Sequence, residues 1–159
     1  MALSAHAKEL IDTWVEKYPP DKKRSAVLAA LREAQHENQG FLTVELMDEV
    51  AGRLEMAPIQ VYEVASFYSM LETTPVGRHS VSVCTNISCM LRGADEIVAH
   101  VENKFDIKLG ESTADGRVFL KREEECLAAC CGAPMMMVDH IYHENLTLSA
   151  VDKILDELK

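Results

Sequence analysis

The sequence predicts an α+β protein in two parts, a helical bundle over residues 1–76 followed by a small α/β sandwich over residues 77–159. Two changes along the chain support this division. Apolar residues recur at helical spacing in the first half, whereas Val81 and Val83 alternate with Ser80, Ser82 and Cys84 in the second. With 48% apolar residues, the chain can bury a core. The boundary is placed near "ETTPVGRH", where the period changes.

The first two helices are predicted from the spacing of their apolar residues. Residues 3–18 show the pattern of one amphipathic helix, which "YPPD" ends. Residues 27–34 show a second, which we expect to end at the turn containing Gly40. Both should pack one face on the core of the bundle.

Two further helices complete the predicted bundle. Apolar residues over 46–54 indicate the third helix, with Thr43 as its N-cap. Pro58 suits the first turn of the fourth. That segment, "PIQVYEVASFYSML", is apolar on most sides, so it should be buried between partners, most simply as core packing.

The second part is predicted to have the order β-α-β-β-β-α. Its elements are a strand at 80–84, a helix at 97–105, a strand in "GRVFLKRE", two strands in "PMMMVDHIYHE" around a tight Asp139-His140 turn, and a helix at 151–158. This alternation is typical of a small sandwich of helices on a sheet.

Charge and the first residues exclude several classes of partner. Sixteen basic against twenty-six acidic side chains give a formal net charge of -10, which argues against binding nucleic acid. The start, "MALSAHAKELIDTWVEKYPP", has no basic region followed by an apolar run. We therefore expect neither export nor a membrane span.

The five cysteines are the residues that carry chemistry. They lie in "VCTNISCMLRG" and "ECLAACCGAPMM", on loops at the ends of predicted strands. Their odd number and the absence of a secretory pattern favour a metal, redox or catalytic use over a disulfide framework. Taking Cys126 and Cys130 as the second pair, the pattern is C-x4-C followed by C-x3-C. Four thiolates at such open spacings favour a [2Fe-2S] cluster, while a structural zinc site and unliganded redox thiols remain alternatives.

Longer stretches around these cysteines resemble a known family. "FYSMLETTPVGRHSVSVCTNISCMLRGA" and "ECLAACCGAPMM" closely resemble the small thioredoxin-like [2Fe-2S] subunit of NADH:quinone oxidoreductase, bacterial respiratory complex I. "KKRSAVLAALREAQHENQGFLTVELMDEVAGRLEMAPIQVYEVASFY" is similar to the same family, so the resemblance covers nearly the whole chain.

The resemblance implies a helical bundle followed by a thioredoxin-like ferredoxin domain. It implies one [2Fe-2S] cluster, held by the residues that match Cys84, Cys89, Cys126 and Cys130. It also implies a partner, a larger flavoprotein subunit that binds NADH and FMN, from which the cluster accepts one electron. The chain would then be a redox subunit that does not itself oxidise NADH, in the cytoplasmic peripheral arm of a membrane-bound complex, without inserting into the membrane.

Cys131, the acidic residues 123–125 and the histidines are given no part in holding the cluster. Cys131 makes a second C-x4-C pairing with Cys126 formally possible, but the family register favours Cys130, leaving Cys131 as a small buried residue or spare thiol. Residues 123–125, in "EEEC", would disfavour reduction if close to a cluster, but a solvated acidic loop is at least as good an interpretation. No histidine is given a role, because four cysteines already fill the ligand set.

Alternative functions remain at this point. Similar subunits serve NAD-linked hydrogenases and formate dehydrogenases, which share the flavoprotein module. A thiol-disulfide oxidoreductase would suit the implied fold, but the chain lacks the C-x-x-C motif of that chemistry. A zinc-stabilised interaction module would use the same four thiols.

Overall fold

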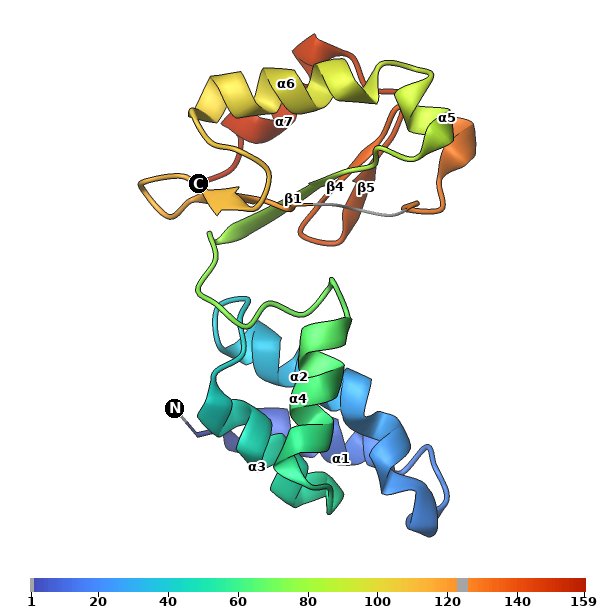
Figure 1. Ribbon diagram of the computed structural model, residues 1–159, viewed down its shortest axis with the longest axis vertical. Coiled ribbons are helices and arrows are strands. Elements are labelled where there is room, and N and C mark those ends of the chain that lie inside the picture. The colour runs from blue at the N-terminus through green and yellow to red at the C-terminus, as the bar shows by residue number, and fades with distance from the viewer. Residues whose placement is uncertain (1, 123–125) are drawn as a thin grey trace. The chain divides into compact units, whose positions relative to one another are not determined.

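The computed structural model describes residues 2–122 and 126–159. The chain forms two compact units, divided between Pro75 and Val76. The sequence places the domain boundary one residue later, and the independence of the two parts as domains stays a prediction. Figure 1 shows helices alone in the first unit and a sheet with helices in the second.

Four α-helices and one 3-10 helix make up the first unit. They are α1 (Ala5–Val15), η1 (Pro20–Ala26), α2 (Val27–Glu37), α3 (Val44–Leu54) and α4 (Pro58–Phe67). Thr43 caps α3 as expected, because its side chain accepts a hydrogen bond from the Leu46 N–H at 3.3 Å. The four predicted helices are confirmed, whereas η1 was not predicted, because a short 3-10 turn leaves no lasting apolar period.

The core of the first unit lies between α1, α2, α3 and α4. Its largest fully buried side chains include Ile11, Leu31, Leu46, Leu54 and Val61. Val61 and Ala65 join this core from α4, which confirms core packing for that side of the helix. Within its own unit, however, α4 is covered on one side alone. Ile59 and Phe67 are 62% and 79% exposed, so the expected burial on most sides is not met here.

The second unit contains one mixed, five-stranded sheet. Its strands are β1 (His79–Val83), β2 (Glu111–Ser112), β3 (Val118–Leu120), β4 (Met136–Val138) and β5 (Ile141–His143), in the order β2-β3-β1-β4-β5. Strands β1 and β3 pair in parallel, and the other pairs are antiparallel. A parallel pair needs a long crossover, which α6 (Ala94–Phe105) supplies.

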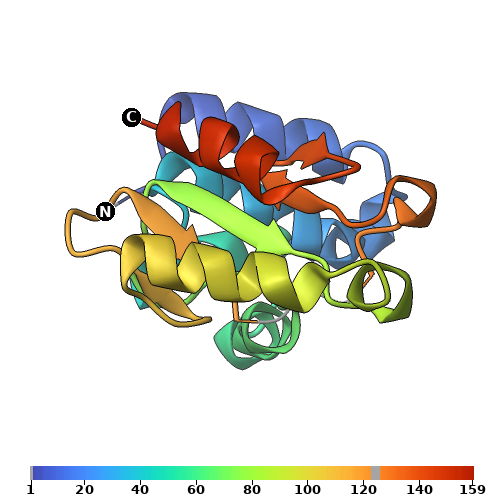
Figure 2. The same cartoon turned by 90° about the horizontal axis from the view of Figure 1, so that it is seen from above.

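Helices α6 and α7 (Leu148–Asp156) lie side by side against the sheet, as Figures 1 and 2 show. Ile97 and Val101 from α6 pack with Val151 and Leu155 from α7 on the buried valines of the strands. Lys104 joins the two helices by ion pairs to α7. The predicted α+β class and its β-α-β-β-β-α order are confirmed, with β2 and the one-turn helix α5 (Ile87–Met90) added.

The hairpin of β4 and β5 turns at the two predicted residues. Asp139 and His140 have φ of 47° and 70°, the left-handed region that a tight hairpin turn requires. Gly77 meets another local constraint before β1. A Cβ there would lie 2.5 Å from the backbone carbon of Val118, so a larger residue would push β1 away from β3.

Among the helices of the described residues, none is long and apolar enough to cross a membrane.

Truncating a buried side chain of α3 and an exposed side chain of α4 should lower the free energy of unfolding by different amounts. Leu54 is fully buried, so Leu54→Ala should lower the free energy of unfolding by about 2–5 kcal/mol through lost burial and the cavity left behind. Ile59→Ala, at an exposed site, should change it by about 0.5 kcal/mol or less. Urea unfolding followed by far-ultraviolet circular dichroism measures both. Equal losses for the two variants would contradict this packing.

Candidate metal centre

The pairing of β1 with β4 brings the two cysteine loops to one end of the sheet. The strands are antiparallel, with Val83 opposite Met136, so the loop after β1 and the loop before β4 lie together. The Cys84 N–H continues this pairing and donates to the Met135 oxygen at 3.2 Å. Cysteines far apart in the sequence therefore become neighbours.

The first two cysteines are buried. Cys84 directly follows β1 and is 2% exposed, while Cys89 lies on α5 and is 1% exposed. Asn86 caps α5, because its side chain accepts a hydrogen bond from the Ile87 N–H at 2.9 Å. This cap fixes the single helical turn that aims Cys89 back toward Cys84.

The second group lies on an exposed loop. The Cys126 and Cys130 sulfurs are 3.4 Å apart, and the Ala128 N–H donates to the Cys126 sulfur at 3.4 Å. Ala128 has a φ of 63°, so the loop doubles back between the two cysteines. Such an amide contact stabilises negative charge on sulfur.

Hydrogen bonds between thiols link the two groups. The Cys84 thiol interacts with those of Cys89 and Cys126, and Cys126 interacts with Cys130. The hydrogen bond with Cys126 is the main cause that raises the pKa of Cys130. The four thiols implied as ligands are thus connected as a chain of neighbours.

The two buried thiols differ in proton affinity. Burial works to raise the pKa of Cys84, yet backbone hydrogen bonds from Leu127 and Asn86 leave it below its usual value. Burial, followed by the hydrogen bond with Cys84, raises the pKa of Cys89 to about 11. A thiol must lose its proton to bind a metal, so a metal held by Cys89 would require proton release there.

The four thiols are neighbours, but they are not arranged around one point as the ligands of a metal are. Within the part of the chain that the structure describes, no three His, Cys, Asp or Glu side chains are grouped as ligands of a metal ion. Pairwise contacts nevertheless join thiols of both loops. They make the four thiols a suitable donor set, and which of them hold a metal stays a prediction.

Cys131 shares the 3-10 turn η2 (Cys130–Gly132) and is exposed, rather than the buried residue considered from the sequence. Two hydrogen bonds hold the end of this turn to the residues after β5. The Gly132 and Pro134 main-chain oxygens accept them from the Asn145 and Leu146 N–H groups at 2.6 and 3.0 Å. The Ala133-Pro134 peptide bond is cis. These anchors after β5 were missed in the sequence.

Gly132 was one signal that could have revealed these anchors. A Cβ at Gly132 would collide with the side chain of Glu144, so the loop and the end of β5 pack closely because this residue is glycine. Residues 123–125, for which both a solvated acidic loop and an effect on reduction were considered from the sequence, lie outside the described residues.

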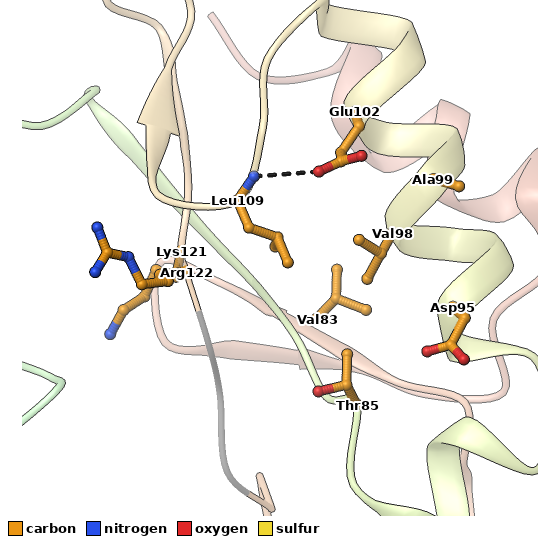
Figure 3. A pocket seen from close by; sticks show the side chains of 9 residues that line it. All are labelled: Val83, Thr85, Asp95, Val98, Ala99, Glu102, Leu109, Lys121 and Arg122. Carbon is orange, nitrogen blue, oxygen red and sulfur yellow. Dashed lines mark hydrogen bonds between the residues drawn. The ribbon is translucent and has the colours of Figure 1, made fainter.

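A cavity of about 630 Å³ lies beside the cysteine loops. Figure 3 shows its lining, in which Val83 and Thr85 flank Cys84 while Asp95 and Glu102 come from α6. Glu102 already accepts hydrogen bonds from the Leu109 N–H and the Lys108 side chain. Lys121 and Arg122 are also on the lining, so it carries both signs of charge and none of the thiols.

Comparisons with known proteins show the family of this chain. The sequence matches the family described as thioredoxin-like [2Fe-2S] ferredoxin over residues 11–159. It is 42% identical over 148 residues to an NADH-quinone oxidoreductase subunit of Rickettsia typhi, covering 93% of this chain and 86% of the relative. It is 40% identical to NADH dehydrogenase [ubiquinone] flavoprotein 2, mitochondrial, of Dictyostelium discoideum, covering 94% of this chain and 60% of that one.

A solved structure shows the same fold. The chain superposes on part of an NAD+-reducing [NiFe]-hydrogenase, crystallised in the air-oxidised state, with a TM-score of 0.70 at 23% identity. The match covers 82% of this chain but 22% of the other, so this chain spans about a fifth of that one. The fold predicted from the resemblance, a helical bundle with a thioredoxin-like domain, is confirmed. The converging thiols, the mixed sheet and the match over nearly the whole sequence together establish that this chain belongs to the thioredoxin-like [2Fe-2S] ferredoxin family.

Proposed function

We propose that this chain is an electron-transfer subunit of an NADH:quinone oxidoreductase, with one [2Fe-2S] cluster held by Cys84, Cys89, Cys126 and Cys130. The observation that carries the proposal is the contact between thiols of the two loops, in a chain of this family. When bound, such a cluster takes up and passes on one electron at a time.

The chain's own groups suit four thiolates. Backbone hydrogen bonds at Leu127 and Asn86 favour the ionised form of Cys84, and the Ala128 N–H donates to the Cys126 sulfur at 3.4 Å. Cys84 and Cys89 are closed off from water, while the second pair is open. The protein therefore supplies a dry side that excludes solvent and an open side by which the group can be approached.

The proposed partner is a flavoprotein subunit that binds NADH and FMN and delivers the electron. The names of the relatives, which include subunits of NADH-quinone oxidoreductases, support membership of such a complex. Large apolar side chains exposed on α4 and around α5, including Phe67 at 79% and Leu91 at 76%, support association with other proteins. We place the chain in the cytoplasmic peripheral arm of the complex, as a redox subunit without a substrate site of its own.

A second candidate is the equivalent subunit of an NAD-linked hydrogenase or formate dehydrogenase. The structural match to an NAD+-reducing hydrogenase favours keeping it, although at 23% identity that match speaks for the fold alone. The higher identity to NADH-quinone oxidoreductase subunits favours the first candidate. Identifying the proteins that co-purify with the native chain distinguishes the two, because the hydrogenase alternative requires hydrogenase subunits.

The bound group can be identified directly in the purified protein. Protein purified without oxygen should be brown, hold two irons and two acid-labile sulfides per chain, and give the electron paramagnetic resonance signal of a reduced [2Fe-2S] cluster. Metal analysis and spectra check this. Stoichiometric zinc without iron would overturn the proposal in favour of a zinc-stabilised module.

The neighbouring cysteines of η2 should differ. Cys130→Ser should lose most of the iron, because a hydroxyl oxygen is a poor substitute for a thiolate. Cys131→Ala is the matched control at the adjacent exposed position and should keep the iron and the visible spectrum. The reverse result would assign the ligand to Cys131 and replace the C-x3-C pairing with C-x4-C.

The isolated chain should not oxidise NADH. Its sequence has no G-x-G-x-x-G fingerprint for a dinucleotide. Assays with NADH and an artificial acceptor should give background rates for the chain alone and activity once the flavoprotein subunit is added. Rapid turnover by the chain alone would refute this division of roles.

A further inference from the structure

His79 contacts two oxygens through both nitrogens of its ring, at the end of β1 opposite the cysteines. Its Nδ1 lies 2.6 Å from the Asp139 carboxylate, in the turn between β4 and β5. Its Nε2 lies 2.9 Å from the main-chain oxygen of Lys159, after α7. One side chain thus joins three parts of the unit.

Both partners are hydrogen-bond acceptors. An ionised carboxylate and a main-chain oxygen have no proton to give, and a neutral imidazole carries one N–H only. The ring can donate to Asp139 and Lys159 together only when both of its nitrogens are protonated. The geometry therefore fits the imidazolium form, and the neutral form would have to give up one of the two contacts.

We propose that His79 is a protonation-dependent latch, which ties the start of β1 to the β4–β5 turn and to the residues after α7 and opens when the ring loses its proton. This inference does not depend on the proposed function.

The β4–β5 turn, whose Asp139 binds His79, has a backbone conformation that other contacts must stabilise. Asp139 and His140 both have positive φ, a conformation that crowds the Cβ of a residue with a side chain. Asp139 offsets this through three contacts with β1: its N–H donates to the Ser80 oxygen at 3.1 Å, its second carboxylate oxygen accepts from the Ser80 N–H at 2.9 Å, and the first binds His79. The contact between His79 and Asp139 therefore helps to hold β1 in register with β4.

Other charges face the same place. Arg78, the neighbour of His79, donates to the Lys159 main-chain oxygen at 2.6 Å, and Arg117, before β3, donates to the Leu158 oxygen at 3.1 Å. Arg78 disfavours a further positive charge on the ring. The two arginines also bind the main-chain oxygens of the last residues, so opening the latch frees the histidine ring without releasing those residues, and Asp139 keeps its two hydrogen bonds with Ser80.

The balance of these charges favours the protonated ring. The hydrogen bond with Asp139 is the largest cause that raises the pKa of His79, ahead of the opposing effect of burial and of the contact with Lys159. Because the pKa in the folded state is raised, the latch contributes its full stability below the pKa of an unfolded histidine. That contribution is lost as the pH rises through the raised folded value.

The direct test is nuclear magnetic resonance of the imidazole nitrogens in the full chain. The ring of His79 should titrate at a higher pH than in the urea-unfolded chain, so both of its nitrogens should show the shifts of protonated nitrogen up to that higher pH. His100, which contacts the Asp152 carboxylate at 2.9 Å through Nε2, is an internal control in the same spectra.

Asp139→Asn is the matched variant. Asn tolerates positive φ and can still accept from the Ser80 N–H, so the turn should be kept. The titration midpoint of His79 should fall by about one pH unit, a tenfold loss of proton affinity.

His79→Gln provides a second readout that does not need assigned spectra. Its loss of stability relative to the natural chain, measured as the shift in urea midpoint, should be largest at acid pH and shrink as the pH rises through the titration of His79. A titration midpoint no higher than in the urea-unfolded chain, a midpoint that Asp139→Asn leaves in place, or a stability loss independent of pH would each overturn the latch.

Discussion

The antiparallel pairing of β1 with β4 is the contact on which the site depends. It sets Val83 opposite Met136 and lets the Cys84 N–H reach Met135, which places the two cysteine loops at one end of the sheet. The parallel pairing of β1 with β3 on the other side, and the cover of α6 and α7, hold β1 in the middle of the sheet. A central strand is fixed by hydrogen bonds on both edges and by burial of its side chains, so the residue that follows it has little freedom.

Much of this fold could be predicted, because its main elements are long enough to show a period. The helices of the first unit and α6 and α7 have apolar faces at helical spacing, and the Asp139-His140 pair separates two runs of strand-forming side chains. Elements such as α5 and β2 escape prediction because one helical turn or two strand residues leave no pattern. Their existence is decided by tertiary contacts and by local ones such as the cap from Asn86.

The candidate site divides in the same way. The four cysteines could be singled out from residue type and spacing, and their family assigned from the surrounding sequence. What the sequence could not reveal is their unequal surroundings, with Cys84 and Cys89 sealed in and Cys126 and Cys130 open. Burial depends on neighbours distant in the sequence, among them Met135 and Leu127, and on the fastening of η2 by Asn145 and Leu146.

The distance along the chain between the two cysteine loops also orders the assembly of the protein. A hairpin such as β4–β5 closes across a two-residue turn, whereas β1 must wait for β4 to be synthesised and for α6 to cross over before it has partners on both edges. Until then the sheet does not hold the two pairs of cysteines together. For the cluster proposed above, delivery of iron and sulfur would therefore come after the sheet has closed, when the two loops are neighbours and Cys126 and Cys130 face the solvent.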